Sequence, residues 1–175
     1  MCIRLTSHNA EETTTLGERM GRLLHPGDVV CLYGELGSGK TVLTKGLAKG
    51  LEVAREDEVR SPSFVLIHRY EGRVAVYHAD LFRLAGSADV ADLGLRELLG
   101  GEGVTIIEWA DKLDALLPTE RLDITLQHAE ADTRLMTLHG HGARYLRLLE
   151  EWQDDLAGRA DICHPGRNAA GRAPS

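Results

Sequence analysis

The chain has 175 residues, of which 43% are hydrophobic and 27% are charged. This length and balance fit one ordinary globular domain and argue against collagen, a long coiled coil or general disorder. The 27 acidic and 20 basic residues give a formal net charge of −7. Because such a charge repels a phosphate backbone, the chain is not expected to bind nucleic acid by itself.

Cysteine spacing and hydropathy predict a cytoplasmic protein. Cys2, Cys31 and Cys163 are widely spaced and form no CxxC pair, so the sequence indicates neither a zinc site nor a disulfide framework. No apolar run approaches the roughly 18 residues that a membrane helix needs, and the first ten residues lack the apolar core of a signal peptide. We therefore expect a reducing compartment and no membrane partner.

Strands and helices are predicted to alternate over the first 51 residues. Apolar residues recur at helical spacing after a candidate N-cap, Ser7 or Asn9, and Pro26-Gly27 ends that helix. The next apolar run is continuous, as in a strand covered on both faces, and a second amphipathic helix follows. In chain order these elements are a strand at Ile3–Thr6, a helix at Glu11–Leu24, a strand at Val29–Tyr33 and a helix at Lys40–Leu51.

The rest of the chain is predicted to complete an α/β sheet. Runs rich in β-forming residues predict three further strands and a closing pair, and helical spacing predicts three more helices. The strands are expected at Ser63–Tyr70, Val74–Asp80, Val104–Glu108, Asp123–Gln127 and Leu135–His139, and the helices at Ala88–Leu99, Asp111–Leu117 and Tyr145–Leu156. From Ala157 the composition shifts to Gly, Ala, Arg and Pro. We therefore expect one domain over residues 1–156 and a disordered tail over residues 157–175.

The strongest motif is Gly34-Glu35-Leu36-Gly37-Ser38-Gly39-Lys40-Thr41, which fits GxxxxGK[ST] between a predicted strand and a predicted helix. Glycines let successive backbone N–H groups turn inward around phosphate oxygens, and the helix that follows adds its positive end. Lys40 is expected to reach the β- and γ-phosphates, and the Thr41 hydroxyl to ligate Mg²⁺. The alternative is an ordinary glycine turn with an exposed lysine.

Two carboxylates follow predicted strands at one edge of the expected sheet. Glu108 ends the apolar run Val104–Ile107, and Asp80 ends the run Val74–Ala79. A side chain at the carboxyl end of a strand can meet Mg²⁺ directly or through water. A helix N-cap or a solvated strand end would explain each residue as well. Their shared position favours a function at this edge.

Three further features are less specific. Ser63 follows Ser61-Pro62 and could sense the γ-phosphate or Mg²⁺ as switch loops do, although Ser-Pro also begins ordinary turns. Trp109 could cover the phosphates or pack in the core. The isolated arginines, among them Arg69, Arg83 and Arg134, include no convincing arginine finger.

Together these motifs resemble one family, the TsaE (YjeE) ATPases of bacterial tRNA threonylcarbamoyladenosine biosynthesis. The resemblance extends from the amino-terminal helix to about Leu156. The chain departs from the common family pattern at Ser63, where the family usually has Thr, and at Ala110, where it usually has Pro. The four motifs that carry the resemblance are GELGSGKT at Gly34–Thr41, SPSF at Ser61–Phe64, YHADLFRL at Tyr77–Leu84 and IIEWADK at Ile106–Lys112.

The resemblance implies a single P-loop NTPase-like α/β domain, with a central sheet flanked by helices, that binds ATP or ADP with Mg²⁺. It implies that Thr41 and Glu108 hold the metal and that Asp80 lies near the γ-phosphate. The expected catalytic residues are Lys40, Asp80 and Glu108. The expected nucleotide-binding residues are Glu35, Leu36, Gly37, Ser38, Gly39, Lys40, Thr41, Val42, Ser63 and Trp109.

By the same resemblance, the chain binds and hydrolyses ATP in a complex with TsaB and TsaD. Those partners transfer the threonylcarbamoyl group to adenosine 37 of tRNA, and the chain would meet tRNA only through them. Because no arginine finger is evident, hydrolysis is expected to be slow for the chain alone and faster in the complex.

Three other functions are compatible with the phosphate motif. A small-molecule or nucleoside kinase would use the same phosphate cradle, although the sequence has no arginine-rich lid segment. A GTPase would explain Asp111-Lys112-Leu113-Asp114, which resembles NKxD with Asp in place of Asn, but no DxxG follows an earlier strand. A nucleotide-gated interaction module would bind nucleotide with little turnover.

Overall fold

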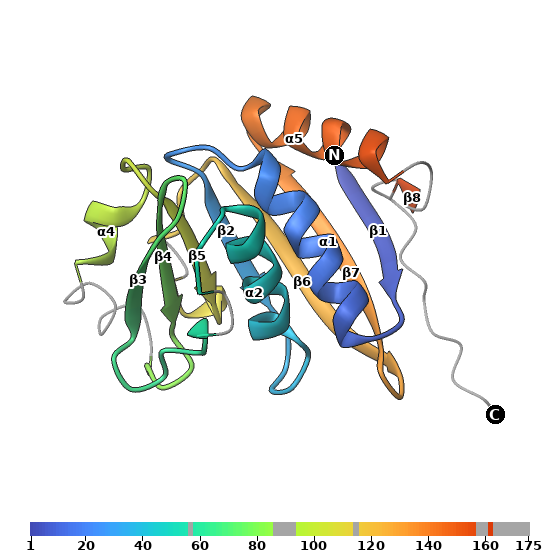
Figure 1. The fold of residues 1–175 in the computed structure, drawn as a ribbon, viewed down its shortest axis with the longest axis horizontal. Helices are drawn as coiled ribbons and strands as arrows, with labels where there is room; N and C mark the ends of the chain where they lie inside the picture. The colour runs from blue at the N-terminus through green and yellow to red at the C-terminus, as the bar shows by residue number, and fades with distance from the viewer. Residues whose placement is uncertain (56–57, 86–93, 114–115, 157–160, 163–175) are drawn as a thin grey trace.

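An eight-stranded mixed sheet runs through the molecule, in the order β3-β4-β5-β2-β6-β7-β1-β8 (Figure 1). The computed structural model describes residues 1–55, 58–85, 94–113, 116–156 and 161–162. The strands are β1 (Cys2–Ser7), β2 (Val29–Tyr33), β3 (Ile67–Glu71), β4 (Ala75–Asp80), β5 (Val104–Glu108), β6 (Arg121–Glu130), β7 (Thr133–His141) and β8 (Asp161–Ile162). The helices are α1 (Ala10–Leu23), α2 (Lys40–Gly50), α4 (Leu95–Leu98), the 3-10 helix η2 (Ala110–Lys112) and α5 (Ala143–Asp155).

The centre of the sheet is parallel, and its flanks are antiparallel. Strands β4, β5, β2 and β6 pair in parallel, whereas β3, β7, β1 and β8 join antiparallel. In this register Glu108 pairs with Asp80 on one side and with Leu32 on the other. The carboxyl ends of β2, β4 and β5 therefore meet at one edge, as the positions of the two carboxylates predict.

Two hydrophobic cores cover the two faces of the sheet. Alternate residues of β2 enter different cores, because successive side chains of a strand point to opposite faces. Val30 and Leu32 join the core beneath α1, α2 and α5, whereas Val29 and Cys31 join the core beneath α4 and η2. Helices on both faces of a sheet with a parallel centre confirm the predicted α/β class.

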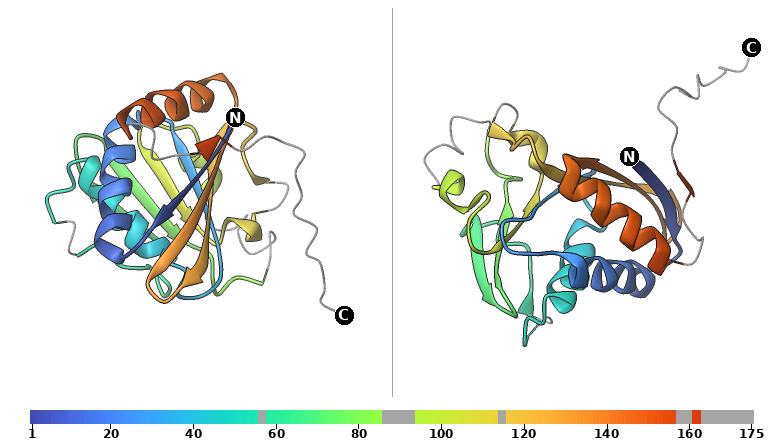
Figure 2. Two further views of the ribbon diagram at one scale, coloured as in Figure 1. Left: turned by 90° about the vertical axis from the view of Figure 1, so that its right-hand side faces the viewer. Right: turned by 90° about the horizontal axis from the view of Figure 1, so that it is seen from above.

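Helices α1 and α2 lie side by side on one face (Figure 2). Glycines let their backbones touch: a Cβ added at Gly46 would lie 2.2 Å from the Thr14 carbonyl oxygen, and one at Gly50 would lie 2.1 Å from that of Glu18. Such distances leave no room for a side chain. This packing fixes α2, whose first residues carry the phosphate motif.

Several predicted boundaries differ from those observed. β3 begins at Ile67 rather than Ser63, because the N–H groups of Val65 and Leu66 both donate to the Pro62 carbonyl and form a turn. Among the described residues of the predicted helix at Ala88–Leu99, only Leu95–Leu98 are helical, and residues 86–93 lie outside the described part.

The segments after β5 and after α5 also differ from expectation. Instead of a helix from Asp111, the short helix η2 follows β5, and residues 114–115 of the predicted helix are not described. The predicted disordered tail lies outside the described residues except for Asp161 and Ile162, which form β8. Within the described ranges, no helix combines the length and hydropathy needed to cross a membrane.

The cysteines differ from the sequence-based expectation in one respect. Cys31 is free and buried at the centre of β2, and burial raises the pKa of its thiol to about 12. Cys2 is disulfide-bonded, so the expectation of a chain without disulfides is wrong at this residue. Strand β8 pairs antiparallel with β1, the strand that carries Cys2.

Candidate functional site

A cavity of about 360 Å³ opens at the carboxyl ends of β2, β4 and β5. It collects residues from the phosphate motif, from the Ser-Pro segment and from the ends of both carboxylate-bearing strands. The lining residues are Leu36, Gly37, Gly39, Lys40, Thr41, Val42, Ser61, Ser63, Asp80, Phe82, Arg83, Glu108 and Trp109. All the site residues expected from sequence are among them except Glu35 and Ser38. Those two line a neighbouring cavity of about 290 Å³, beside β6.

The loop between β2 and α2 takes a backbone path that needs glycine. Gly34 has a φ of +139°, and a Cβ there would lie 2.4 Å from the Leu126 carbonyl oxygen. Gly39, at φ +103°, is the N-cap of α2 and offers no side-chain cap. The first turn of α2 contains no acidic residue. The positive helix end is therefore left open for an anion from outside the loop.

The Lys40 ammonium lies folded back into this loop. Nζ donates to the carbonyl oxygens of Gly34, at 2.7 Å, and Glu35, at 2.8 Å. It also sits 4.1 Å from the centroid of the Trp109 ring, an arrangement typical of a cation–π contact. Burial lowers the pKa of Lys40, and the nearby carboxylates of Glu108 and Asp80 oppose that shift. Within the described residues, the site thus holds a largely dehydrated cation that only neutral carbonyl and hydroxyl oxygens and a ring contact directly.

Trp109 borders the cavity rather than the core alone. Its backbone adopts φ +60°, a left-handed conformation that is rare for a bulky residue. Its ring contacts Phe82 as well as Lys40, with 5.0 Å between the two ring centroids. The sequence allows Trp109 to cover the phosphates or to pack in the core. Its position over Lys40 favours the first interpretation.

Glu108 is 2% exposed, and both of its carboxylate oxygens are bonded. Thr41 Oγ1 donates to Oε2 at 3.0 Å, and His78 Nε2 lies 2.9 Å from Oε1. A hydroxyl and a carboxylate are hard oxygen donors of the kind that Mg²⁺ prefers. The pair Thr41 and Glu108 therefore has the chemistry to hold this ion together with phosphate oxygens and water.

The described residues form no metal cage made of protein side chains alone. Within the described ranges, no group of three or more His, Cys, Asp or Glu residues is placed to hold a metal. Mg²⁺ usually keeps several waters and binds through one or two protein groups plus substrate phosphates. The donor set fits a metal that arrives with a nucleotide.

Asp80 is 3% exposed and organises the Ser-Pro segment. Its Oδ2 accepts hydrogen bonds from Ser61 and, at 3.3 Å, from Ser63, while its Oδ1 accepts the N–H of Phe82 at 2.9 Å. The two serine hydroxyls are 2.6 Å apart. The structure therefore brings Ser63 and Asp80 together at one wall of the cavity.

Sequence reasoning missed two residues of this site, His78 and Ser61. Both lie inside motifs that the sequence analysis identifies, but the pattern predicts no separate role for either. Ser61 is expected to begin a turn, and His78 to lie in a strand. The only sequence signal for His78 is a polar residue in a run that otherwise forms a buried strand.

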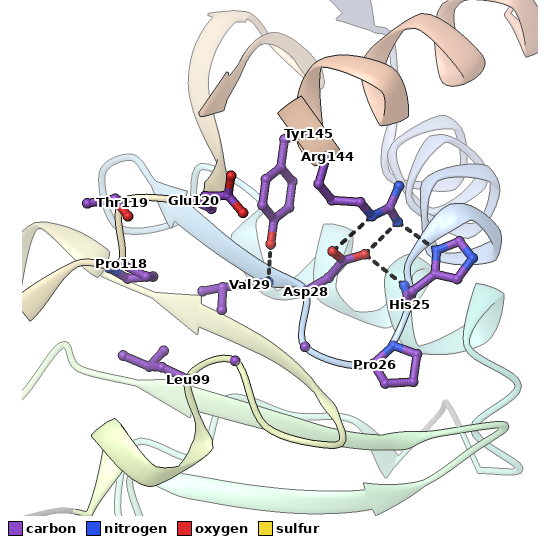
Figure 3. Close-up of a pocket in the computed structure, with 12 residues that line it drawn as sticks. His25, Pro26, Asp28, Val29, Leu99, Pro118, Thr119, Glu120, Arg144 and Tyr145 are labelled. Carbon is purple, nitrogen blue, oxygen red and sulfur yellow. Dashed lines mark hydrogen bonds and ion pairs between the residues drawn. The ribbon is translucent and has the colours of Figure 1, made fainter. Parts of the chain in front are cut away.

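A larger cavity, of about 740 Å³, lies at the amino end of β2 (Figure 3). There Arg144 donates to both carboxylate oxygens of Asp28, at 3.2 and 2.7 Å, and the His25 N–H donates to Asp28 at 2.7 Å. The Tyr145 hydroxyl accepts the N–H of Val29 at 2.7 Å. These bonds join the start of α5 to the loop before β2. A structural role therefore accounts for the polar side chains around this cavity.

Comparison with known proteins agrees with the motifs and the fold. The family model for threonylcarbamoyl adenosine biosynthesis protein TsaE matches residues 7–136. The chain belongs to the TsaE family. The tRNA threonylcarbamoyladenosine biosynthesis protein TsaE of Bacillus subtilis is 42% identical to it over 144 residues, covering 82% of this chain and 89% of that protein. The TsaE of Treponema pallidum is 40% identical over 136 residues, covering 78% and 99%.

A solved structure supports the same assignment. The crystal structure of Bacillus subtilis YdiB superposes with a TM-score of 0.75 and 35% sequence identity, covering 89% of this chain and 96% of that one. The predicted family and the P-loop NTPase-like α/β fold are thus confirmed. As a TsaE, the chain has a role in tRNA threonylcarbamoyladenosine biosynthesis.

Proposed function

We propose that this TsaE binds ATP with Mg²⁺ in the cavity at the P-loop and hydrolyses it to ADP. One observation carries the proposal: a buried ammonium, an uncapped helix amino terminus and a hydroxyl–carboxylate pair converge on the same cavity. A nucleoside triphosphate needs these three groups, for its charge, its oxygens and its metal.

Different side chains of the cavity contact the phosphates, the metal and the attacking water. Lys40 exchanges its carbonyl partners for β- and γ-phosphate oxygens, which bind an ammonium more strongly because they are charged. Thr41 and Glu108 hold Mg²⁺, which neutralises charge on the phosphates when bound. Asp80, with Ser61 and Ser63, forms the polar wall at which the attacking water is placed.

We also propose that the chain acts with TsaB and TsaD and does not itself transfer the threonylcarbamoyl group. Apolar side chains at the cavity and on the Ser-Pro segment are exposed as at a protein contact: Leu36, Phe64, Val65 and Phe82. The guanidinium of Arg83 stacks 4.2 Å from the centroid of the Phe64 ring. Because Arg83, the arginine in the described lining of the cavity, is held in this way, hydrolysis by the chain alone is slow, and the partners accelerate it. The acidic net charge fits a chain that meets tRNA only through its partners.

ATP hydrolysis by the purified chain, alone and with TsaB and TsaD, tests this proposal. In P-loop enzymes an arginine supplied by a partner is worth about 10³–10⁵ in rate, so stimulation of at least tenfold is expected. Chelation of Mg²⁺ should abolish turnover. Equal rates with and without the partners would contradict the partner dependence. Stimulation of hydrolysis by a metabolite instead would favour a kinase. Stronger competition for binding by GTP than by ATP would favour a GTPase.

A further inference from the structure

His78 is a fully buried histidine that touches the candidate metal site without lining its cavity. It lies on β4, in register with Ile106 of β5 and with His68 of β3. Its side chain is 0% exposed, and its Nε2 lies 2.9 Å from Oε1 of Glu108. Its Nδ1 is buried and has no hydrogen-bond partner in the part of the chain that the structure describes.

We propose that His78 is a positioning residue that orients the Glu108 carboxylate for Mg²⁺. This inference rests on the proposed function, because it concerns how the chain holds the metal that accompanies the nucleotide. His78 binds Oε1 and thereby directs Oε2 toward Thr41, whose hydroxyl lies 3.0 Å from it. His78 acts only through Glu108, because it is absent from the cavity lining.

The hydrogen-bond geometry assigns the tautomer of His78. A carboxylate oxygen only accepts, so the bond to Oε1 requires a hydrogen on Nε2. A hydrogen on Nδ1 would be a buried donor without an acceptor, which is costly, whereas an unpaired lone pair at that atom costs less. The contact with Glu108 therefore places a hydrogen on Nε2.

Fixing both oxygens matters because a carboxylate at a strand end can rotate. Thr41 alone bonds one oxygen, and the next hydroxyl, that of Thr44, is 3.5 Å from Oε1 and already donates to the Lys40 carbonyl at 3.0 Å. Loss of the imidazole would leave Oε1 buried without a close donor. Residues that orient a metal ligand in this way are typically worth 10–100-fold in metal affinity or activity.

Three variants test the inference. H78L replaces the imidazole with an apolar side chain of similar size that has no hydrogen-bond donor. H78Q places an amide N–H near the position of Nε2. H68L is the matched control, because His68 is the cross-strand neighbour of His78 but bonds Tyr70, at 3.2 Å, rather than Glu108. H78L should lower kcat about 10–100-fold and raise the Mg²⁺ concentration for half-maximal rate, with the KM for ATP within about threefold. H78Q should recover to within about threefold of wild type, and H68L should match wild type.

Nitrogen-15 NMR of the histidine side chains supplies a readout independent of turnover. In protein free of metal and nucleotide, His78 should show a hydrogen on Nε2 that is bonded to Glu108, and the Nε2 signal should shift in E108Q. No hydrogen on Nε2, or no response to E108Q, would overturn the inference. This comparison needs no His78 variant, so a folding defect in H78L leaves it decisive.

The kinetic outcomes separate the two proposals. Wild type without Mg²⁺-dependent hydrolysis would reject the proposed function, while the NMR comparison would still decide the contact between His78 and Glu108. Active wild type with H78L equally active would overturn the positioning role. H78Q as impaired as H78L would also overturn it, because loss of packing rather than of the donor would then explain the defect.

Discussion

The two ends of β2 show how differently polar groups can be used in one small protein. At the amino end, Arg144, Asp28 and His25 bond one another around the larger cavity. At the carboxyl end, around the smaller cavity, the described partners of the Lys40 ammonium are neutral oxygen atoms of the loop, and α2 has no side-chain cap. Ion pairs such as Arg144 and Asp28 stabilise the fold. An ammonium such as Lys40, which bonds no charged group directly among the described residues, is available to bind an anionic ligand. Volume alone would have pointed to the wrong end.

The largest effect that this comparison predicts is on nucleotide affinity in K40A. Lys40 would form at least two charge-assisted hydrogen bonds to phosphate, each worth about 1.5–3 kcal/mol, so its loss should weaken ATP binding roughly 10²–10⁴-fold. Isothermal titration calorimetry measures this change. K49A is the matched control, because Lys49 lies on the same helix but pairs with Glu18 at 3.0 Å. Unchanged ATP affinity in K40A would contradict the role of the loop.

At the other end of β2, R144A should change stability and leave binding alone. It removes the partner of the buried Asp28 carboxylate, which destabilises a fold by about 3–5 kcal/mol for a fully buried pair. Because the Arg144 side chain is 27% exposed, we expect about 2–3 kcal/mol. Urea unfolding tests this value, and ATP affinity should stay within about twofold.

Arg147 provides the control for that measurement. It lies on the same helix as Arg144 but is exposed, so R147A should change the free energy of unfolding by less than about 0.5 kcal/mol. If R144A weakened ATP binding tenfold in protein that is still folded, the division of roles between the two ends would be wrong.

The smallest effect is expected at the polar wall of the proposed nucleotide cavity. The Ser63 hydroxyl lies 3.3 Å from Asp80, and one such hydrogen bond is worth about 0.5–1.5 kcal/mol. S63A should therefore slow ATP hydrolysis about two- to tenfold without weakening ATP binding. S63T keeps the hydroxyl and should behave as wild type in steady-state kinetics. An equal loss in both variants would show that space, not the hydroxyl, matters at this position.

The fold could be predicted from sequence where local pattern and tertiary environment agree. The bounds of β2 and β5 match the prediction at every residue, because both strands are buried on two faces and read as continuous apolar runs. The pattern predicts the start of β3 too early, because Phe64 and Val65 have strand-forming side chains but are 84% and 65% exposed, in a turn. Hydrophobic pattern cannot distinguish a buried strand from an apolar surface segment.

The candidate site could be predicted only as far as motifs reach. The phosphate motif predicts Lys40 and Thr41, because it is one contiguous loop. Two strand ends at the same edge of the sheet predict the carboxylates Asp80 and Glu108. The bond from His78 to Glu108 joins side chains 30 residues apart on neighbouring strands. It depends on the register of β4 with β5, which no local pattern encodes.

A crystal structure with Mg²⁺ and a non-hydrolysable ATP analogue tests the central claim most directly. The account predicts that the phosphates lie on the loop from Gly34 to Thr41, with Lys40 Nζ moved from the Gly34 and Glu35 carbonyls to phosphate oxygens. Nucleotide bound at the amino end of β2, with Lys40 still on those carbonyls, would contradict it.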